Sequence, residues 1–364
     1  MRVLVFNWRC WLNPAMGGAE VFTREVARRW VRSGHEVTLF ASAFPCCKHE
    51  EVLDGVRVVR AGGRFSVYWR AKEYYRKRFS GEGFDVVVDE VNTRPFFASG
   101  FVRNGERVVC LVHQLAREYW FYEVPFPLSY LGYYCLENRW LRGCAGLPVV
   151  TVSESTRRDL VGLGFDDVRV VPVGLSFEPS EAVGEKEGFP VVVYAGRLRR
   201  AKRVDHAVRA FGVVRAKLPD AEFWVLGDGS FEKSLRGLAG EGVRFFGGLS
   251  DGERRALVRR AWVLVNPSVR EGWGLNVVEA NALGVPCVAY DVAGLRDSVK
   301  DGETGLLADA GDIDGFAERV LAVLGDEGLR MRLSRNALEY SRRFSWDKTA
   351  EEFMKVLEEV VSAK

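Results

Sequence analysis

The segment NPSVREGWGLNVVEANALGVPCVAYD, in the C-terminal third of the chain, constrains the fold more strongly than any other stretch. A short apolar run at Val263–Val265 has the length of a buried strand, and Pro267 and Gly272 then interrupt the pattern. Residues Gly274–Leu283 follow with apolar side chains at helical spacing. A strand, a turn and a helix therefore meet here, as they do in a parallel α/β sheet. Such a junction directs free backbone N–H groups and the positive end of a helix dipole toward bound ligands, so an anionic ligand is expected.

Two carboxylates, Glu271 and Glu279, flank this turn. An ionised carboxylate only accepts hydrogen bonds, so the pair suits hydroxyl groups better than phosphate. A ligand that carries both phosphates and hydroxyls, such as a nucleotide sugar, would match both the anion-binding turn and the two carboxylates. The alternative is that both are ordinary solvated carboxylates near a helix N-terminus, where negative charge is favoured by up to about 1 kcal/mol.

A cationic cluster lies in the segment VVVYAGRLRRAKRVDHAVRAF. Pro190–Ala195 has the length and apolarity of a strand, Gly196 ends it, and an amphipathic helix begins at Lys202 or Arg203. Arg197 and Lys202 thus both follow a strand end, where an arginine fork and a lysine ammonium suit a diphosphate. By themselves these cations indicate only a solvated helix start; together with the two glutamates they indicate a diphosphate site.

These motifs resemble those of a known family. The GRL turn is followed by a lysine five residues after its arginine, and about seventy residues later by PS-x-x-EGWGLNVVEANALGVPCVA. GGAE at Gly17–Glu20, SES at Ser153–Ser155 and DGETGLL at Asp301–Leu307 extend the similarity along nearly the whole chain. The sequence resembles the retaining glycosyltransferases of family 4, which have the GT-B fold.

The resemblance implies transfer of a sugar from a nucleoside diphosphate donor with retention of configuration, by a front-face route in which the leaving diphosphate helps to deprotonate the incoming hydroxyl. Arg197 and Lys202 would hold the diphosphate, Glu279 the ribose hydroxyls and Glu271 the donor sugar. Further donor-binding positions are expected at Gly272, Trp273, Gly274, Leu275, Asn276, Phe246 and Gly247. The sequence contains no D-x-D pair at a strand end, so we expect no metal and no cofactor beyond the nucleotide sugar.

The first half of the chain carries weaker motifs. The loop after the first strand, NWRCWLNPAMGGAE, is not G-x-G-x-x-G, which disfavours a dinucleotide oxidoreductase. Gly17 and Gly18 precede an amphipathic helix, where glycine either admits a ligand close to the backbone or simply forms the turn. His113 follows a strand; a lone histidine is more often structural, but LVHQ resembles the family segment whose histidine contacts the donor sugar, so His113 is expected in the catalytic site.

Alternating strand and helix patterns predict two doubly wound, Rossmann-like domains facing a central cleft. The expected strands are Val3–Phe6, Glu36–Ala41, Val86–Asp89, Val108–His113, Val149–Ser153, Val168–Pro172, Pro190–Ala195, Phe223–Leu226, Val243–Phe246, Val263–Val265 and Cys287–Tyr290. We expect an acceptor-binding domain over 1–175, a linker over 176–188, a nucleotide-sugar-binding domain over 189–345, and a C-terminal helix over 346–364 that crosses back to the first domain, as the resemblance implies.

Composition permits this assignment. The 364 residues are 48% hydrophobic and 28% charged, enough for two domains with separate cores. A net charge of +3 and the absence of recognition motifs argue against nucleic-acid binding. Seven cysteines without C-x-x-C spacing suggest neither a disulfide framework nor structural zinc. Because a strand pattern starts directly after Met1, we expect no signal peptide and a cytoplasmic protein, peripheral on the inner face of the cell membrane if it binds one.

Two segments bear on the acceptor. Residues 57–79 hold eight basic residues, one acidic residue and six interleaved aromatics, which suits either a helix on an anionic membrane or a surface helix that buries its aromatics on the domain. Residues 113–140 are rich in aromatics but too polar and proline-broken to span a bilayer, and suit an acceptor wall or an ordinary packed lid.

The expected activity is therefore transfer of a hexosyl unit from a UDP- or GDP-sugar to a hydroxyl of a glycan, glycolipid or lipid-linked acceptor. The alternatives are a nucleotide-sugar epimerase of the same fold and a non-catalytic nucleotide-sugar-binding protein. The epimerase would need no acceptor, whereas the binding protein would neither transfer nor hydrolyse the donor.

Overall fold

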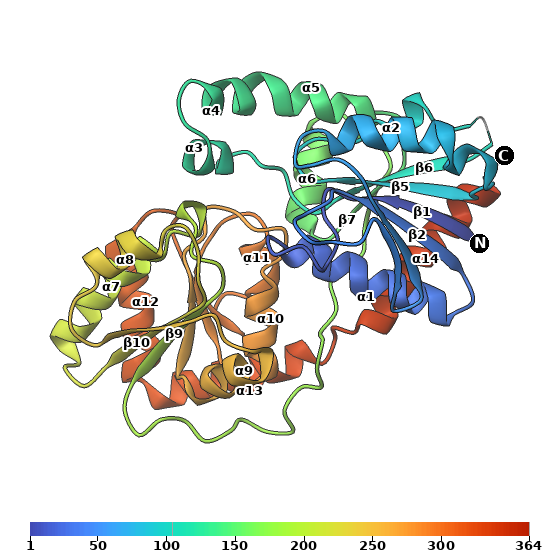
Figure 1. Ribbon diagram of the computed structural model, residues 1–364. Coiled ribbons are helices and arrows are strands. Elements are labelled where there is room, and N and C mark those ends of the chain that lie inside the picture. The colour runs from blue at the N-terminus through green and yellow to red at the C-terminus, as the bar shows by residue number, and fades with distance from the viewer. Residues whose placement is uncertain (104, 364) are drawn as a thin grey trace. The chain divides into compact units, whose positions relative to one another are not determined.

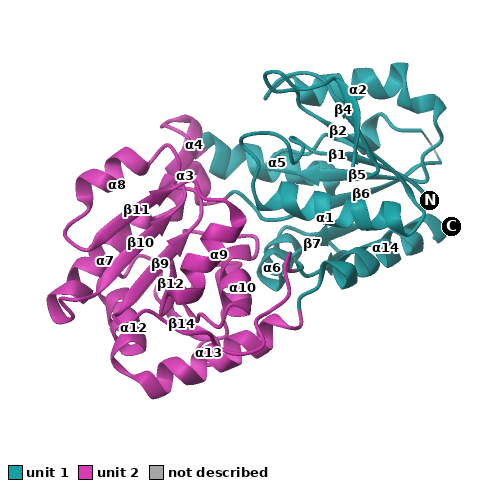
Figure 2. Cartoon of the chain, turned by 60° about the horizontal axis from the view of Figure 1, so that its bottom comes forward, with its two compact units in different colours: residues 1–116, 131–174, 344–364 teal, residues 117–130, 175–343 magenta. Residues whose placement is uncertain are grey.

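The computed structural model describes residues 1–103 and 105–363. These residues form two compact units, each built from more than one stretch of chain (Figure 2). The first unit comprises 1–116, 131–174 and 344–364, and the second comprises 117–130 and 175–343. The exact boundaries expected from the sequence stay a prediction.

The first unit contains an eight-stranded sheet with helices on both faces (Figure 1). Its strand order is β3-β4-β2-β1-β5-β6-β7-β8, and every neighbouring pair is parallel except β3 and β4. The strands are β1 (Arg2–Phe6), β2 (Glu36–Ala41), β3 (Glu50–Leu53), β4 (Val56–Arg60), β5 (Val86–Val91), β6 (Arg107–Val112), β7 (Val149–Thr151) and β8 (Val168–Val170). The direction in which the chain adds strands reverses between β1 and β5, and at such a switch point open α/β sheets bind ligands.

Helices and short helical turns connect these strands. They are α1 (Gly18–Arg32), α2 (Val67–Lys77), η1 (Phe79–Gly81), η2 (Ala98–Gly100), η3 (Gly132–Leu136), α5 (Glu137–Leu141), η4 (Arg142–Cys144), α6 (Glu154–Gly162) and α14 (Trp346–Ser362). One further short helix, α4 (Leu128–Leu131), carries the chain from residues of the second unit into the first.

The C-terminal helix α14 packs on α1, as expected. The indole Nε1 of Trp30 donates to the carbonyl of Ala350 at 2.9 Å, and Arg29 pairs with Asp347 at 2.5 Å. The ring of Phe353 lies 5.2 Å from that of Trp30. These contacts complete the core of the first unit with the last residues of the chain.

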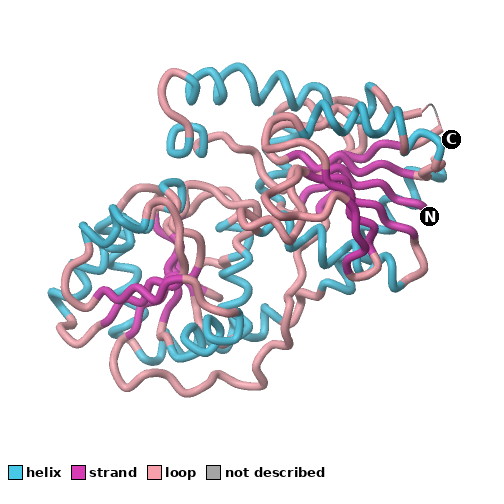
Figure 3. Tube along the Cα trace, in the orientation of Figure 1, coloured by secondary structure: helices cyan, strands magenta, loops and turns pink. Residues whose placement is uncertain are grey.

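The second unit contains a wholly parallel six-stranded sheet in the order β11-β10-β9-β12-β13-β14. Its strands are β9 (Val191–Ala195), β10 (Glu222–Leu226), β11 (Val243–Gly247), β12 (Val263–Asn266), β13 (Cys287–Tyr290) and β14 (Gly305–Ala308). Its helices are α3 (Tyr119–Glu123), η5 (Arg200–Lys202), α7 (Val204–Lys217), α8 (Glu232–Leu238), α9 (Asp251–Arg260), α10 (Leu275–Ala282), α11 (Leu295–Ser298), α12 (Ile313–Gly325) and α13 (Glu327–Ser341). In Figure 3 strands and helices alternate along this unit.

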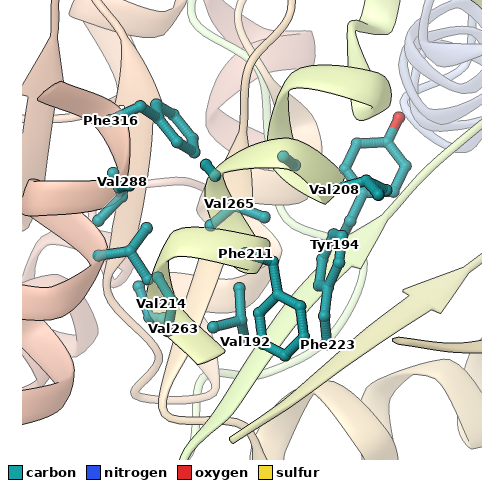
Figure 4. Close-up of a cluster of buried hydrophobic side chains, with 14 of the residues drawn as sticks. Val192, Tyr194, Val208, Phe211, Val214, Phe223, Val263, Val265, Val288 and Phe316 are labelled. Carbon is teal, nitrogen blue, oxygen red and sulfur yellow. The ribbon is translucent and has the colours of Figure 1, made fainter. Parts of the chain in front are cut away.

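The sheet of the second unit is buried on both faces, which explains why its strands have continuous apolar sequences. On one face, Val192 and Phe223 pack with Phe211 of α7, and Val288 packs near Phe316 of α12 (Figure 4). The switch point of this sheet lies between β9 and β12.

The expected strands are confirmed, with β2 and β13 at the expected bounds. The interpretation of 57–79 as one helix is wrong at its start, because 57–60 belong to β4 and the helix α2 begins at Val67. The hairpin β3–β4 and the strand β14 were not expected. Arginine at both ends of RVVR suggested a surface segment, yet the Arg60 side chain is buried and paired with Glu51.

Candidate donor-binding site

The cationic and acidic motifs meet at the switch point of the second unit. Arg197 and Lys202 follow the C-terminal end of β9, and Glu271 follows that of its neighbour β12. Parallel strands bring their carboxyl ends to one edge of the sheet, so residues about seventy positions apart become neighbours. The backbone N–H of Val269 donates to the carbonyl of Ala201 at 3.0 Å, which fastens the two loops together.

Lys202 and Glu271 form an ion pair with 2.5 Å between Nζ and Oε1, and their side chains are only 16% and 14% exposed. The Ser268 hydroxyl donates to the same carboxylate oxygen at 2.8 Å. Burial disfavours the charged ammonium, but the adjacent Glu271 carboxylate outweighs it, so the pKa of Lys202 is raised. Lys202 therefore carries a positive charge at physiological pH.

The backbone around Glu271 depends on a glycine that sequence reasoning did not identify. The Glu271 N–H donates to the carbonyl of Ala293 at 3.0 Å, which brings Gly294 against it. Gly294 has φ +83°, and a Cβ atom there would lie 2.1 Å from the Glu271 carbonyl oxygen. Only glycine fits both that conformation and that approach.

The turn after Glu271 leads directly into helix α10. Gly274 precedes the helix with φ +92°, and Leu275 is its first residue. Gly272 and Trp273 lie in the turn and are partly exposed. The expected cradle residues therefore occupy the N-terminal entrance of α10, where backbone N–H groups lack partners within the helix.

Glu279 lies one helical turn further along α10, beside Arg254 of α9. Arg254 Nη2 lies 3.5 Å from the Glu279 carboxylate and 3.1 Å from Asp251. Burial raises the pKa of Glu279, and Arg254 opposes that rise only in part. A small pocket at this point is lined by Ala195, Arg254, Arg255, Val258, Asn276, Glu279, Ala280 and Leu283.

Several of the remaining expected donor-binding positions already make contacts within the protein. Asn276 uses its amide within the protein: Nδ2 donates to the Ala195 carbonyl at 3.0 Å, and Oδ1 accepts from Asn266 at 3.1 Å. Asn276 therefore links α10 to the C-terminal ends of β9 and β12. Phe246 packs on Trp224 at the end of β11, and Gly247 follows it with φ +71°.

The most important residues that sequence reasoning missed come from 117–130. The Tyr119 ring lies 5.8 Å from Lys202 Nζ, and burial raises the pKa of its phenol. Glu123 accepts from the Ala201 N–H at 3.2 Å, and Tyr122 accepts from Arg203 at 2.8 Å. These contacts fasten residues 117–130, here called the latch segment, to the loop that carries Lys202. Nothing in its sequence pattern indicates this long-range packing.

The expected residues of the first half of the chain lie in the first unit. Gly17 caps α1, and its N–H donates to Glu20 at 2.5 Å, while Gly18 is the first helical residue. His113 follows β6 and is held by Glu90, with 2.9 Å between His113 Nε2 and Glu90 Oε1. The contact between His113 and a donor sugar stays a prediction.

Within residues 1–103 and 105–363, no helix is long and apolar enough to cross a membrane. The same part of the chain contains no group of three or more His, Cys, Asp or Glu side chains placed to hold a metal ion.

These features define an α/β protein with a candidate ligand site at the switch point of its second sheet, and family models specify its class further. Residues 16–178 match the model described as Glycosyltransferase Family 4, and residues 176–340 match Glycosyl transferases group 1. The two matches together cover most of the chain. The chain belongs to the family-4, group 1 glycosyltransferases, as the sequence motifs indicate.

Individual relatives support the assignment. Over 224 residues the chain is 31% identical to a phosphatidyl-myo-inositol mannosyltransferase of Mycobacterium leprae, a match covering 59% of each protein. Over 229 residues it is 33% identical to a D-inositol 3-phosphate glycosyltransferase of Acidothermus cellulolyticus, covering 57% of this chain and 51% of that protein. The matches thus span little more than half the length of these curated relatives.

The fold is shared over the whole chain. The solved structure of a sucrose-phosphate synthase from Thermosynechococcus elongatus matches with a TM-score of 0.84, 20% identity and full coverage of both chains. At that identity the likeness concerns the fold alone. Together with the two parallel Rossmann-like sheets it confirms the GT-B fold expected from the sequence.

Proposed function

We propose that this protein is a retaining glycosyltransferase that moves a hexosyl unit from a nucleoside diphosphate sugar, with UDP or GDP, to a hydroxyl of a glycan, glycolipid or lipid-linked acceptor. The proposal is supported chiefly by the buried Lys202–Glu271 pair at the switch point of the second unit. An ammonium has three N–H donors, so pairing with one carboxylate does not exhaust it. Lys202 can therefore bind phosphate oxygens while Glu271 accepts from sugar hydroxyls.

The proposed chemistry depends on charge stabilisation. As the bond between the anomeric carbon and the leaving diphosphate oxygen breaks, negative charge grows on the diphosphate. The acceptor oxygen forms its bond to the anomeric carbon, and its proton passes to the leaving phosphate. Lys202 and Arg197 offset that charge, a contribution that typically amounts to about 10²-fold or more in rate for one preorganised group. Glu279 is assigned to the ribose hydroxyls. His113 is assigned to the donor sugar, and no metal is assigned to the reaction.

We also propose that the acceptor is met at an anionic membrane on the cytoplasmic side. The support comes from α2 and the turn before it, where Phe65 and Trp69 are 75% and 74% exposed. The same segment carries exposed basic side chains, at Arg64, Arg70, Lys72, Arg76, Lys77 and Arg78. The other aromatics of 57–79 pack on the domain, with Tyr75 and Phe79 fully buried, so only two of the six are available to a lipid surface.

The two relatives are named for acting on phosphatidyl-myo-inositol and on D-inositol 3-phosphate. Both names describe a polyol bearing phosphate, and we propose an acceptor of similar chemistry, a hydroxyl next to a phosphate group. The basic character of the α2 surface favours such an acceptor over a neutral glycan.

The proposal is tested by thermal unfolding with UDP, GDP, ADP and their sugar conjugates. A ligand at 100 times its Kd stabilises the folded state by about 2.7 kcal/mol, which raises Tm measurably. We expect one nucleotide class to stabilise the wild type but neither Lys202→Ala nor Glu279→Ala. Lys217→Ala, an exposed lysine at the far end of α7, is the matched control and should respond like the wild type.

Two outcomes would redirect the proposal. If no nucleotide stabilises the wild type, the transferase and the epimerase are both wrong. If a nucleotide sugar is converted to its epimer without any acceptor, the epimerase is the correct alternative.

A further inference from the structure

A buried polar network lies at the switch point of the first unit, at the carboxyl ends of β1 and β5. Asn92 donates to Asn7 at 3.0 Å, Asn7 donates to Thr23 at 3.2 Å, and Thr23 donates to Glu90 Oε2 at 2.6 Å. His113, after β6, contacts the other carboxylate oxygen of Glu90 at 2.9 Å. Three adjacent strands and helix α1 thus contribute to one cluster.

Glu90 is the centre of this network and has no exposed surface. Burial raises its pKa, the hydrogen bonds from His113 and Thr23 oppose the rise, and the nearby Glu20 carboxylate adds to it. A buried carboxylate costs folding free energy unless specific partners compensate. Its position at the end of a strand, aimed at a histidine, therefore requires an explanation beyond packing.

The imidazole of His113 is oriented on two sides. Its Nε2 faces Glu90, and its ring meets the Phe22 ring edge-to-face at 5.1 Å between centroids. An ionised carboxylate only accepts, so the hydrogen of the Nε2 contact belongs to the imidazole. In the neutral ring Nδ1 then carries the lone pair and can accept a hydrogen bond from a hydroxyl.

We propose that Glu90 is a positioning residue for the transfer reaction: it keeps the hydrogen of His113 on Nε2, so that Nδ1 accepts a hydrogen bond from a sugar or acceptor hydroxyl. The inference rests on the proposed glycosyltransferase activity and adds to it a residue outside the family motifs described above. The Glu20 carboxylate also acts on Glu90, and Arg9 pairs with Glu20 at 3.0 Å.

The first arm of the test needs no substrate. The chain has four histidines, so ¹⁵N-labelled imidazole signals can be assigned with His113→Gln. We expect neutral His113 of the wild type to be protonated on Nε2. In Glu90→Gln, whose neutral amide can donate as well as accept, we expect both tautomers. An Nδ1-protonated ring in the wild type, or an unchanged tautomer in the variant, overturns the proposal.

The second arm uses transfer kinetics. Removing the partner that orients such a ligand-binding histidine should cost roughly 10- to 100-fold in kcat, by analogy with metal-site histidines. The dissociation constant for the nucleotide should not change, because Lys202 and Glu279 of the second unit bind it.

Controls separate this role from a structural one. Thr23→Val removes the other donor to Glu90 while leaving the His113 contact, and should change kcat only slightly and leave the His113 tautomer unchanged. Equal losses of kcat in both variants, with the His113 tautomer unchanged in Glu90→Gln, would show that Glu90 only holds α1 in place. If the wild type binds no nucleotide, the proposed activity fails, and the tautomer measurement still decides the role of Glu90.

Discussion

The Nζ atom of Lys202 and the Oε1 atom of Glu271 lie 2.5 Å apart, although the two residues are separated by 69 positions in the chain. Each compensates for the burial of the other, because a lone charge in this place would be costly. The same two groups are those assigned to the diphosphate and to the sugar. If the proposed assignment is correct, substitutions of either residue change both stability and donor binding.

We expect Glu271→Gln to lose about 3 kcal/mol of unfolding free energy, since it leaves a buried ammonium without its counter-charge. The variant should also bind nucleotide with a new pH dependence. In the wild type the Lys202 pKa is raised, so its stabilising charge is present below about pH 10.4 and is lost only above that. In the variant the largest influence that opposes burial is gone, so the Lys202 pKa lies lower than in the wild type.

Nucleotide affinity of Glu271→Gln should therefore fall as pH rises through the mildly alkaline range, where the wild type keeps its affinity. Urea unfolding and calorimetric titration at several pH values measure both effects. Glu178→Gln, an exposed glutamate of the second unit, is the control. Parallel pH curves for Glu271→Gln and the wild type would contradict the assignment.

Gly294→Ala should be far more damaging than an ordinary glycine substitution. A Cβ there would lie 2.1 Å from the Glu271 carbonyl oxygen, so the turn must shift. The matched control is Gly311→Ala, which has φ +89° and no atom within 4 Å, and which should cost only the roughly 1–2 kcal/mol of left-handed backbone. We expect Gly294→Ala to exceed that cost and to abolish nucleotide stabilisation, as thermal unfolding would show. Equal losses of stability for the two substitutions would mean that the turn can shift away from the Glu271 carbonyl at little cost in free energy.

Glu123→Gln should weaken nucleotide binding through the latch segment. Glu123 accepts from the Ala201 N–H and pairs with Arg199 at 3.5 Å, so its charge holds the loop that carries Lys202. Because these contacts are partly exposed, we expect an affinity loss of a few-fold, corresponding to about 1 kcal/mol or less. The loss should shrink as salt rises. An unchanged affinity at low salt would show that the loop keeps its conformation without the latch segment.

Trp69→Ser should reduce binding to vesicles that contain anionic phospholipid. Trp69 is 74% exposed beside basic side chains, so a membrane can bury its ring without unfolding the helix. Val52→Ser, an equally exposed apolar residue of β3, is the control and should bind like the wild type. Sedimentation with vesicles measures the difference. If the wild-type protein stays in the supernatant at low salt, it does not bind these vesicles, and the membrane proposal is wrong.

The parts of the fold that the sequence predicts are those where local pattern and burial agree. Parallel strands such as β9 and β13 are buried on both faces and have continuous apolar runs, so their bounds are visible in the sequence. Strand β4 escaped prediction because Arg57 and Arg60 suggest a solvated segment. Its charge is instead compensated by carboxylates of other segments, such as Glu51 of the neighbouring strand β3 for Arg60 and Glu82, 25 positions away, for Arg57.

The residues of the candidate site also fall into two groups, those that sequence motifs identify and those that only the folded structure brings together. Arg197, Lys202, Glu271 and Glu279 stand in motifs with fixed spacing, so they can be identified from the sequence. Tyr119 and Glu123 contact the loop that carries Lys202 only in the folded structure. No periodicity or motif spacing in the sequence predicts these contacts. The requirement for glycine at Gly294 likewise comes from its close approach to the Glu271 carbonyl oxygen, which the sequence does not show.

The interleaving of the two units limits how the chain can be divided. The first unit is completed by α14, and the second contains the latch segment from the first half of the sequence. A cut between residues 174 and 175 would leave each fragment without a piece of its own core or loop support. During synthesis, the α1 rings of Phe22 and Trp30 therefore stay uncovered until the ribosome has added Trp346 and Phe353, more than 300 positions later.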